Sequence, residues 1–304
     1  MDFNQVYQDL VNLNVGQVIK DEPMYKHTTL RVGGPCAIFI NVNTQDGLIA
    51  ALKYVNKHHL KSMVIGKGSN LLFSDGLYQG VIICLAEGFN YTHYNGCTVT
   101  AGAGVSMIKL AYQAANAGLS GFEFMSGIPG TIGGGVYMNA GAYKYDMASV
   151  VKSVKILNEK YQTVTLTNNQ MEFGYRTSIL QRNPRWVVLE VVFELSPSDP
   201  KFINEVIDKR KEKRMTTQPW NKPSAGSIFQ NPSMAPAWKL IEDCDLRGRE
   251  IGGAQVSLKH CNFIVNNGYA SAKDIYDLIE LVKEEVKKQH DIELHQEVKY
   301  VNWE

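Results

Sequence analysis

The sequence lacks several features that identify large classes of protein. Its start, MDFNQVYQDLVNL, has no basic region followed by an apolar core, so a secretory signal peptide is not expected. Its longest apolar runs, such as VIICLA at 81–86, are far shorter than the roughly 20 residues that span a bilayer. We therefore expect a cytoplasmic protein that does not associate with a membrane.

An excess of one charge is also missing, since 31 Lys and Arg residues stand against 30 Asp and Glu. The whole chain thus offers no basic field for nucleic acid. The few cysteines form an odd set without a C-x-x-C pair, and we expect reduced, mostly buried thiols at Cys36, Cys84, Cys97, Cys244 and Cys261. The histidines show no spacing typical of metal ligands, so no metal is expected.

The length and the apolar content indicate two domains or one elaborated domain. The chain has 304 residues, and 44% of them are apolar, which is enough for sizeable cores. The stretch SPSDP at 196–200 marks a change of composition and is the best candidate for a domain boundary. No internal repeat or low-complexity tract is present.

Hydrophobic patterning predicts strands and helices in both halves, and hence an α+β protein. The predicted strands are 36–42, 62–66, 80–85, 97–104, 150–157, 185–195 and 292–301. The predicted helices are 46–59, 105–118, 201–215 and 271–290. Gly118 is the expected C-terminal cap of the second helix, and Ser271 with Asp274 predicts a capping box on the last one.

One stretch, GIPGTIGGGVYMNAGAY at 127–143, is dense in glycine but matches neither common nucleotide fingerprint. No Lys-Ser or Lys-Thr follows it, so it is not a P-loop. Glycine allows positive φ and lets a ligand or another backbone approach where a Cβ would clash. We interpret the stretch as a loop wrapped around something flat or anionic.

A second glycine-rich stretch, IGKGSNLLFSD at 65–75, follows the predicted strand SMV. Its residues 66–70 could turn successive backbone amides towards a pyrophosphate, although a plain turn after a strand explains them equally well. Two such loops about sixty residues apart favour a dinucleotide site over coincidence.

Six segments follow one another along the chain: HTTLRVGGP (27–35), IGKGSNLLFSD, GIPGTIGGGVYMNAGAY, FGYRTS (173–178), SAGSIFQNP (224–232) and GGAQVSLKHCNFIVNNGYAS (252–271). Together they closely resemble the UDP-N-acetylenolpyruvoylglucosamine reductase family, the MurB flavoenzymes that complete UDP-N-acetylmuramate for peptidoglycan synthesis. The resemblance extends from about residue 20 to the C-terminus.

The resemblance implies a fold and a reaction. The fold would be the FAD-binding fold of the FAD-linked oxidases (PCMH type) with two α+β subdomains, plus an α+β substrate-binding domain. The implied boundaries are an N-terminal segment 1–19, an FAD domain 20–195 and a substrate domain 196–304. The implied activity is the NADPH-dependent reduction of UDP-N-acetylglucosamine-enolpyruvate, with FAD carrying the hydride. A monomer that binds a small nucleotide-sugar substrate is expected.

In that family both glycine-rich loops bind FAD largely through backbone amides. Carried over by motif, the expected cofactor contacts are Gly66, Lys67, Gly68, Ser69, Asn70, Leu71, Gly127, Ile128, Pro129, Gly130, Thr131, Gly133, Gly134, Asn139, Ala142 and Arg214. The missing side chains would then make room for the flavin and its pyrophosphate. Arg214 is expected either to reach a phosphate or to remain a solvated charge of its helix.

The resemblance also implies three catalytic residues. Arg176, in FGYRTS, would hold and polarise the enolpyruvyl carboxylate, which suits the planar fork of a guanidinium. Ser227, in SAGSIFQNP, would give a proton to the α-carbon. Glu297, in LHQEVKYV, is expected on the last strand near the reacting centre, where it would orient a water or Arg176 or share a proton.

Other residues are expected around these three. Tyr175 and Asn231 would contact substrate. His260 would not contact substrate directly but would support the residues that do. Lys299 stands where some family members have Arg, which leaves its contact with substrate open. The short connection between Arg176 and Ser227 indicates the compact type of the family, without an inserted tyrosine-bearing loop.

Two alternatives remain at this stage. The first keeps the fold but makes the protein an FAD-linked oxidase of sugars or hydroxy acids, which would leave SAGSIFQNP and Glu297 without a task. The second is a non-catalytic nucleotide-sugar binding protein, which would be colourless. A visible spectrum before and after NADPH separates all three hypotheses.

Overall fold

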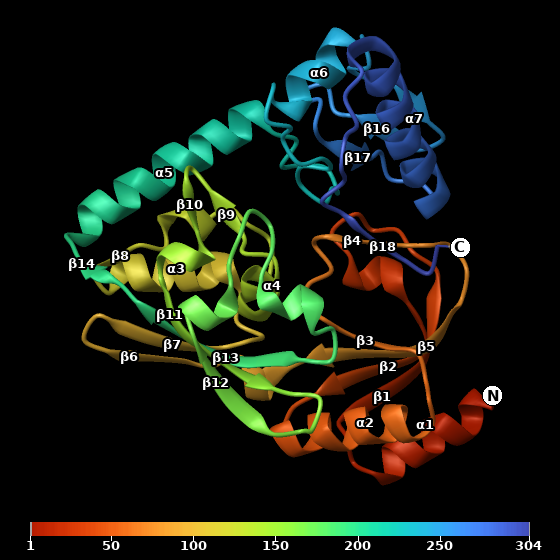
Figure 1. Ribbon diagram of the computed structural model, residues 1–304, viewed down its shortest axis with the longest axis vertical. Coiled ribbons are helices and arrows are strands. Elements are labelled where there is room, and N and C mark those ends of the chain that lie inside the picture. The colour runs from red at the N-terminus through yellow and green to blue at the C-terminus, as the bar shows by residue number, and fades with distance from the viewer. Residues whose placement is uncertain (1, 304) are drawn as a thin grey trace. The chain divides into compact units, whose positions relative to one another are not determined.

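The computed structural model describes residues 2–303 (Figure 1). The chain forms two compact units, and each unit is assembled from several segments. The first unit consists of Met1–Lys20, Ile38–Gly66 and Gly80–Lys211, and the second of Asp21–Ala37, Lys67–Gln79 and Glu212–Glu304. The functional boundaries predicted above, at 19/20 and at 195/196, stay predictions.

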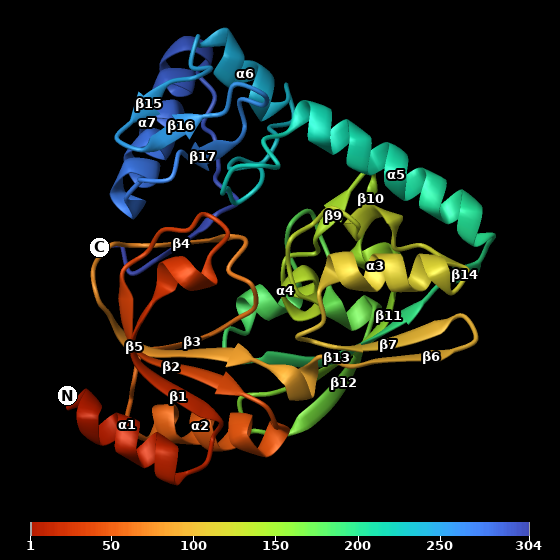
Figure 2. The ribbon, with the colours of Figure 1, turned by 180° about the vertical axis from the view of Figure 1, so that it is seen from behind.

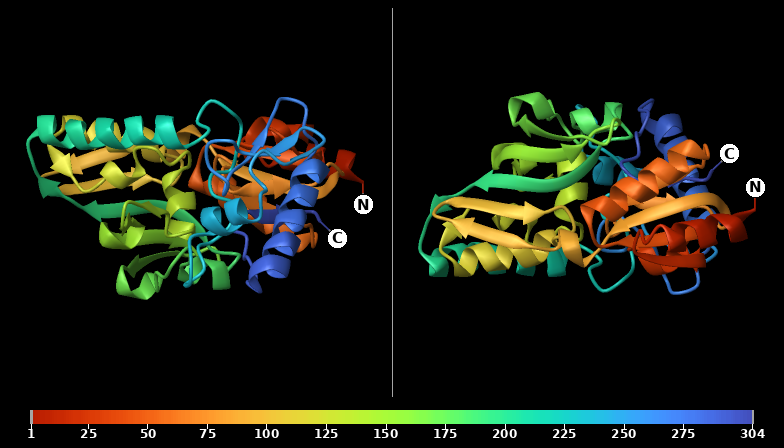
Figure 3. Two further views of the ribbon diagram at one scale, coloured as in Figure 1. Left: turned by 90° about the horizontal axis from the view of Figure 1, so that it is seen from above. Right: turned by 90° about the horizontal axis from the view of Figure 1, so that it is seen from below.

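A four-stranded sheet with the order β1-β2-β5-β3 lies mostly in the first unit. Its central strands β2 and β5 are almost continuously apolar, which is typical of strands buried on both faces. Two helices cover one face, α1 (Phe3–Asn12) and α2 (Gln45–Lys57), and pack Leu10 and Leu48 against the strands (Figures 1 and 3). The strands are β1 Gln17–Pro23, β2 Pro35–Val42, β3 Ser62–Ile65 and β5 Tyr78–Leu85.

A five-stranded sheet with the order β12-β11-β13-β7-β6 completes the first unit. The helices α3 (Met107–Asn116) and α4 (Ile132–Tyr137) lie on one of its faces and bury a shared apolar core (Figures 1 and 2). The strands are β6 Thr92–Asn95, β7 Thr98–Gly102, β11 Val151–Leu157, β12 Thr163–Thr167 and β13 Val187–Glu194. Two short antiparallel pairs accompany it: β8 Leu119–Ser120 with β14 Ser196–Pro197, and β9 Gly141–Ala142 with β10 Tyr145–Asp146.

The second unit has a smaller core between helices and a three-stranded sheet β15-β16-β17. The helix α7 (Ala272–His290) packs on this sheet, and α6 (Ala237–Asp243) packs on α7 (Figure 1). The long helix α5 (Pro200–Thr217) precedes them. The strands are β15 Glu250–Ile251, β16 Ala254–Val256 and β17 Ile264–Asn266, with a separate parallel pair of β4 Leu71–Phe73 and β18 Lys299–Val301.

Short 3-10 helices occupy several connections in both units. They are Met24–His27, Glu87–Phe89, Glu123–Met125, Met147–Ser149, Asn169–Met171 and Ile179–Arg182.

Most elements predicted from patterning are confirmed within a few residues. The capping box of α7 is present, because the Ser271 side chain accepts from the Asp274 amide and the Asp274 side chain from the Ser271 amide. Gly118 follows α3 with φ +72°, as a C-terminal cap requires. The last predicted strand is wrong in extent, since 292–298 lies outside regular structure and only 299–301 forms β18. Among the α-helices and strands of three or more residues, hydrophobic patterning did not predict α1, α4, α6, β1, β4, β6, β12, β16 or β17.

A helix that crosses a membrane must be both long and apolar. Among residues 2–303, none of the helices is both long enough and apolar enough to cross a bilayer. The longest helix, α7, carries a charged face along its whole length.

Candidate functional site

The first glycine-rich loop follows β3 and offers unused amide donors. Among residues 2–303, no protein group accepts a hydrogen bond from the backbone amides of Lys67, Gly68, Ser69 and Asn70. Gly68 has φ +57°, and a Cβ there would collide with the backbone oxygen of His27. A run of amides without acceptors is what an anion such as a phosphate group requires.

The second glycine-rich stretch is not the open loop that the sequence analysis expected, because residues 132–137 form the helix α4. Thr131 caps it by accepting a hydrogen bond from the Gly134 amide at 3.3 Å. Glycine is a poor helix former, but tertiary packing overrides propensity here. A Cβ on Gly133 would lie 3.0 Å from the Ala103 Cβ, and one on Gly135 would lie 2.6 Å from the Met147 Cε.

Gly134 differs from the other glycines of α4. A Cβ there would meet only the Thr131 Oγ1, at 3.5 Å, and the residue is exposed. Protein packing therefore explains Gly133 and Gly135 but leaves Gly134 unexplained. The idea that a missing side chain makes room for a flavin applies to Gly134 alone among these three.

Asn139 lies two residues after the end of α4 and is buried, with 3% of its surface exposed. Its Nδ2 donates to the Gly174 backbone oxygen at 2.8 Å and to the Asp146 carboxylate at 3.0 Å. Its Oδ1 accepts from the Ala148 amide at 3.0 Å. These contacts make Asn139 a connector between α4 and the segment that carries Arg176, while its predicted contact with the cofactor stays a prediction.

Arg176 lies in a tight turn that begins at Gly174. Gly174 and Thr177 exchange both backbone hydrogen bonds, at 3.1 and 3.3 Å, so Tyr175 and Arg176 occupy the tip. Arg176 has φ +57°, which costs a non-glycine residue roughly 1–2 kcal/mol. Its Nη2 donates to the Gly141 oxygen at 3.2 Å, and its guanidinium lies over the Tyr175 ring, 5.1 Å from the centroid.

Two side chains that no sequence motif indicated, those of Gln181 and Ser178, fix the position of this turn through hydrogen bonds. The Nε2 of Gln181 donates to the backbone oxygens of Arg176 at 2.9 Å and of Tyr137 at 3.2 Å. The hydroxyl of Ser178, which is fully buried, donates to the same Tyr137 oxygen at 2.9 Å. The turn is thereby attached to the C-terminal end of α4. A run of polar residues after FGYR was the only available signal.

Ser227 follows Gly226, which has φ +78°, in a segment without regular strand assignment. The residues after Ser227 are nevertheless paired on both sides. The Ile228 amide donates to the Asn262 oxygen at 2.8 Å, and the Ile228 oxygen accepts from the Glu297 amide at 2.7 Å. The side chain of Ser227 is half-buried.

Glu297 lies just before β18 rather than on a strand, which corrects the sequence-based expectation. Its backbone is held at both ends: the amide donates to Ile228, and the oxygen accepts from the Asn70 Nδ2 at 3.0 Å. Asn70 belongs to the first glycine-rich loop. The second unit therefore brings together a predicted cofactor loop, Ser227 and Glu297, although these segments are far apart in the sequence.

The other predicted residues have the following positions. Tyr175 is 57% exposed at the tip of its turn, and Asn231 uses its Oδ1 to accept from the Ala237 amide at the start of α6, at 3.0 Å. Ala142 ends β9, and Arg214 lies in the last turn of α5. Lys299 begins β18 and donates its amide to the Asn70 oxygen at 2.9 Å.

The predicted residues thus fall into two groups. The first unit contains Tyr175 and Arg176 with Gly66, Gly127, Ile128, Pro129, Gly130, Thr131, Gly133, Gly134, Asn139 and Ala142. The second unit contains Ser227, Asn231 and Glu297 with Lys67, Gly68, Ser69, Asn70, Leu71 and Arg214.

The thiols and histidines suggest no further chemistry of their own. Burial raises the pKa of the Cys36 thiol to about 12, so this group is not a ready nucleophile. Burial and the nearby Arg247 lower the pKa of His260. Within residues 2–303, no three His, Cys, Asp or Glu side chains gather as metal ligands would.

Comparison with known families yields two matches along the chain. Residues 218–301 match the C-terminal domain of UDP-N-acetylenolpyruvoylglucosamine reductase, and residues 36–167 match an FAD binding domain.

Curated proteins and solved structures extend the similarity to nearly the whole chain. UDP-N-acetylenolpyruvoylglucosamine reductase 1 of Bacillus anthracis is 44% identical over 297 residues, which are 98% of this chain and 99% of the relative. The reductase of Bacillus subtilis is 42% identical over 297 residues, 98% of each chain. The crystal structure of the enzyme from Thermus caldophilus superposes with a TM-score of 0.80 at 32% identity, covering 93% of this chain and 98% of the other.

Proposed function

Because the chain belongs to the UDP-N-acetylenolpyruvoylglucosamine reductase family, we propose that Arg176, Ser227 and Glu297 act on the enolpyruvyl group of its substrate. The family resemblance inferred from the motifs is confirmed, and so are the α+β FAD-binding fold and the FAD cofactor. The protein is an FAD-dependent oxidoreductase that uses NADPH to reduce UDP-N-acetylglucosamine-enolpyruvate to UDP-N-acetylmuramate, a step of peptidoglycan precursor synthesis.

The residues of the two glycine-rich stretches fit FAD. The amides of residues 67–70 have no acceptor among residues 2–303, and these would hold the pyrophosphate. The exposed backbone at Gly134, where a Cβ would meet only the Thr131 Oγ1, would face the flavin ring system. The remaining proposed contacts, from Gly66, Leu71, residues 127–131, Gly133, Asn139, Ala142 and Arg214, follow from the family motif.

The substrate determines what the side chains must do. An enolpyruvyl group is a carbon–carbon double bond conjugated to a carboxylate. FAD, once reduced by NADPH, supplies the hydride that adds to the β-carbon. The π electron pair then moves to the α-carbon and the carboxylate, so the protein must supply a fixed cation for the carboxylate and a proton for the α-carbon.

Arg176 is the proposed cation. Its guanidinium remains charged when partly desolvated and can bind both carboxylate oxygens. The position of the turn is well defined, because Asn139 and Gln181 hold the backbone oxygens of Gly174 and Arg176. A positive φ at this residue is the kind of backbone strain that gathers at functional sites.

Ser227 is the proposed proton donor. A serine hydroxyl is a weak acid at neutral pH, but a carbanion or enol is a far stronger base, so the transfer runs downhill. Glu297 would orient a water or share a proton as the enol forms. The observation that carries this proposal is the 2.7 Å hydrogen bond from the Glu297 amide to the Ile228 oxygen, which places Glu297 beside the residue after Ser227.

Further roles are assigned by the motif. Tyr175 and Asn231 would contact the nucleotide sugar, and the lack of an inserted tyrosine loop makes this a compact member of the family. The FAD domain would comprise 20–195 and the substrate domain 196–304. We further propose a cytoplasmic monomer without affinity for nucleic acid or membrane. Light scattering of purified protein would check the monomeric state.

A single spectroscopic experiment tests the function. Purified protein is expected to show flavin absorption that NADPH bleaches under anaerobic conditions and that the enolpyruvyl substrate restores. Rapid reoxidation by oxygen without a response to the substrate would instead identify an oxidase. A colourless protein that NADPH leaves unchanged would identify a non-catalytic binding protein.

A further inference from the structure

Asn262 is a buried polar residue in the loop before β17, with 3% of its surface exposed. Its side-chain amide pairs with the backbone of Phe229, which is itself 2% exposed. The Asn262 Oδ1 accepts from the Phe229 amide at 2.9 Å, and the Nδ2 donates to the Phe229 oxygen at 2.9 Å. The side chain thus replaces the backbone of a neighbouring strand.

The main chain of Asn262 adds a third contact to the same segment, because its oxygen accepts from the Ile228 amide at 2.8 Å. One residue therefore makes three hydrogen bonds to the two residues that follow Ser227. On the opposite edge, the Glu297 amide donates to the Ile228 oxygen at 2.7 Å and the Gln230 amide to the His295 oxygen at 2.9 Å. The segment after Ser227 is bound along both edges.

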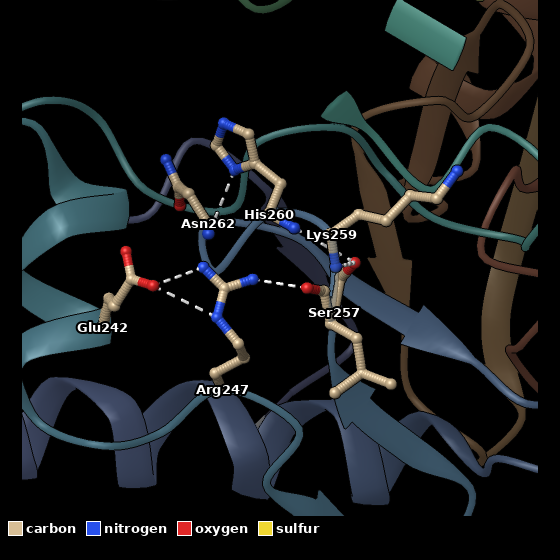
Figure 4. A network of polar contacts seen from close by, with 7 residues as sticks. Glu242, Arg247, Ser257, Lys259, His260 and Asn262 are labelled. Carbon is tan, nitrogen blue, oxygen red and sulfur yellow. Dashed lines mark hydrogen bonds and ion pairs between the residues drawn. The ribbon is translucent and has the colours of Figure 1, made fainter. Parts of the chain in front are cut away.

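The loop that contains Asn262 is itself braced by polar contacts (Figure 4). The Ser257 hydroxyl oxygen accepts from the amides of Lys259 at 3.1 Å and His260 at 3.4 Å. The His260 Nδ1 accepts from the Asn262 amide at 3.3 Å. Arg247 joins the Leu258 oxygen to the Glu242 carboxylate, as the dashed lines in Figure 4 show.

We propose that Asn262 is the positioning residue for Ser227, holding the segment so that the hydroxyl points at the α-carbon of the enolpyruvyl group. The inference rests on the proposed role of Ser227 as proton donor. Proton transfer needs a donor within hydrogen-bond reach, and a displacement of about 1 Å can cost roughly 10²-fold in rate. Asn262 touches no reacting atom and acts through the backbone of Ile228 and Phe229.

The test is a double-mutant cycle between Asn262→Ala and Ser227→Ala. Each enzyme is reduced with NADPH, and its reoxidation by substrate is followed by anaerobic stopped-flow. Alone, Asn262→Ala should slow reoxidation by roughly 10–10²-fold. In the Ser227→Ala background it should slow it by less than about threefold, because the group it positions is gone. Flavin reduction by NADPH should change less than about threefold in every variant.

Asn266 provides the matched control within the same unit. It is 4% exposed, and its side chain makes four hydrogen bonds to backbone: to the oxygens of Leu30 at 3.1 Å and Arg31 at 3.5 Å, and from the amides of Gly268 at 2.7 Å and Ala270 at 3.1 Å. Asn266→Ala should destabilise the unit to a similar degree and leave substrate reoxidation within about threefold of the parent enzyme, since the side chain does not contact the Ser227 segment.

The outcomes separate this inference from the function on which it rests. Equal slowing by Asn262→Ala with and without Ser227 would overturn the positioning role. No slowing by Ser227→Ala alone would overturn the proton-donor role instead. Should Asn262→Ala fold poorly, Asn262→Ser keeps a small polar group and should show the same non-additivity at smaller amplitude. The solvent isotope effect on reoxidation should rise in the Asn262 variants, and an unchanged value would count against the proposal.

Discussion

The turn with Arg176 in the first unit and the segment with Ser227 in the second differ in the source of their hydrogen bonds. Side chains from elsewhere hold the turn, namely Asn139 on Gly174 and Gln181 on Arg176. Backbone groups hold the Ser227 segment on both edges, and within the described residues 2–303 only Asn262 contributes a side chain. The turn also contains a residue at positive φ, whereas beside Ser227 a glycine takes that conformation.

This difference indicates how the Arg176 turn and the Ser227 segment should respond to substitutions of the residues around them. The Arg176 turn depends on several replaceable side chains and must offset its own backbone strain, so single substitutions should displace it. The Ser227 segment has main-chain contacts on both edges, so among residues 2–303 its sensitivity to substitution is concentrated in the Asn262 side chain.

The largest effect is expected for Ser227→Ala. If its hydroxyl protonates the α-carbon, substrate reoxidation of reduced enzyme should slow by about 10²–10⁴-fold, while FAD content and bleaching by NADPH stay near normal. Ser227→Cys should retain more activity than Ala, because a thiol can still donate a proton. Anaerobic stopped-flow measures both half-reactions. Reoxidation within about threefold of the wild-type rate would show that another group is the acid.

Arg176→Lys should produce the next largest effect. Lysine retains the charge but loses the planar fork, the bond to the Gly141 oxygen and the stacking on Tyr175. We expect a loss of about 2–4 kcal/mol in kcat/KM for the enolpyruvyl substrate, typical of one oxyanion-stabilising group. NADPH-dependent bleaching should change far less. Comparable losses in both half-reactions would assign Arg176 to the fold or to FAD.

A pair of glycine variants in α4 should separate cofactor binding from folding. The Cβ of Gly134→Ala meets only the Thr131 Oγ1, at an ordinary contact distance of 3.5 Å, so the FAD-free protein should be unchanged or more stable by up to about 1 kcal/mol, while FAD affinity falls at least about tenfold. Gly135→Ala should lower stability instead, because its Cβ would lie 2.7 Å from the Met107 Sδ. Flavin titration and thermal unfolding distinguish them. Full flavin retention by Gly134→Ala would refute its placement against the cofactor.

Asn139→Ala should weaken the Arg176 turn without removing any catalytic group. The substitution leaves the Ala148 amide without a partner, at about 1–3 kcal/mol if the amide stays buried, and it removes one of the two donors to the Gly174 oxygen, which keeps the Thr177 amide. A turn released from α4 should raise KM for the substrate by roughly tenfold. Steady-state kinetics with thermal unfolding would measure both. A loss of stability with unchanged KM would mean that Arg176 does not depend on this contact.

The smallest effect concerns pH. Burial and Arg247 lower the pKa of His260, so folding favours its neutral form. Unfolded chains then bind more protons, and the stability of the second unit should fall as pH drops below the ordinary histidine value of about 6.5. His260→Gln should remove part of this decline, on the order of 1–3 °C in Tm between pH 7.5 and 5.5. An identical decline in both proteins would exclude His260 as its source.

Much of the local structure and the choice of family could be predicted from the sequence alone. Strands such as 36–42 and 80–85 are so apolar that little else fits them, and Ser271 with Asp274 specifies the start of α7 through its own hydrogen bonds. The ordered motifs identified the family and its cofactor. Those features depend on residues that are close in the chain, where spacing and chemistry are visible without coordinates.

Only the tertiary structure decided how the predicted residues are held. Within the helix at 132–137, a Cβ on Gly133 would crowd Ala103 and one on Gly135 would crowd Met107 and Met147, which no local pattern indicates. Likewise, the Asn262 side chain accepts a hydrogen bond from the Phe229 amide. The Asn70 side chain donates to the Glu297 oxygen, although the two residues are 227 positions apart in the sequence. Hydrogen bonds between distant segments depend on how the chain folds back on itself. The course of the folded chain depends on the whole sequence, so it cannot be read from one residue and its near neighbours.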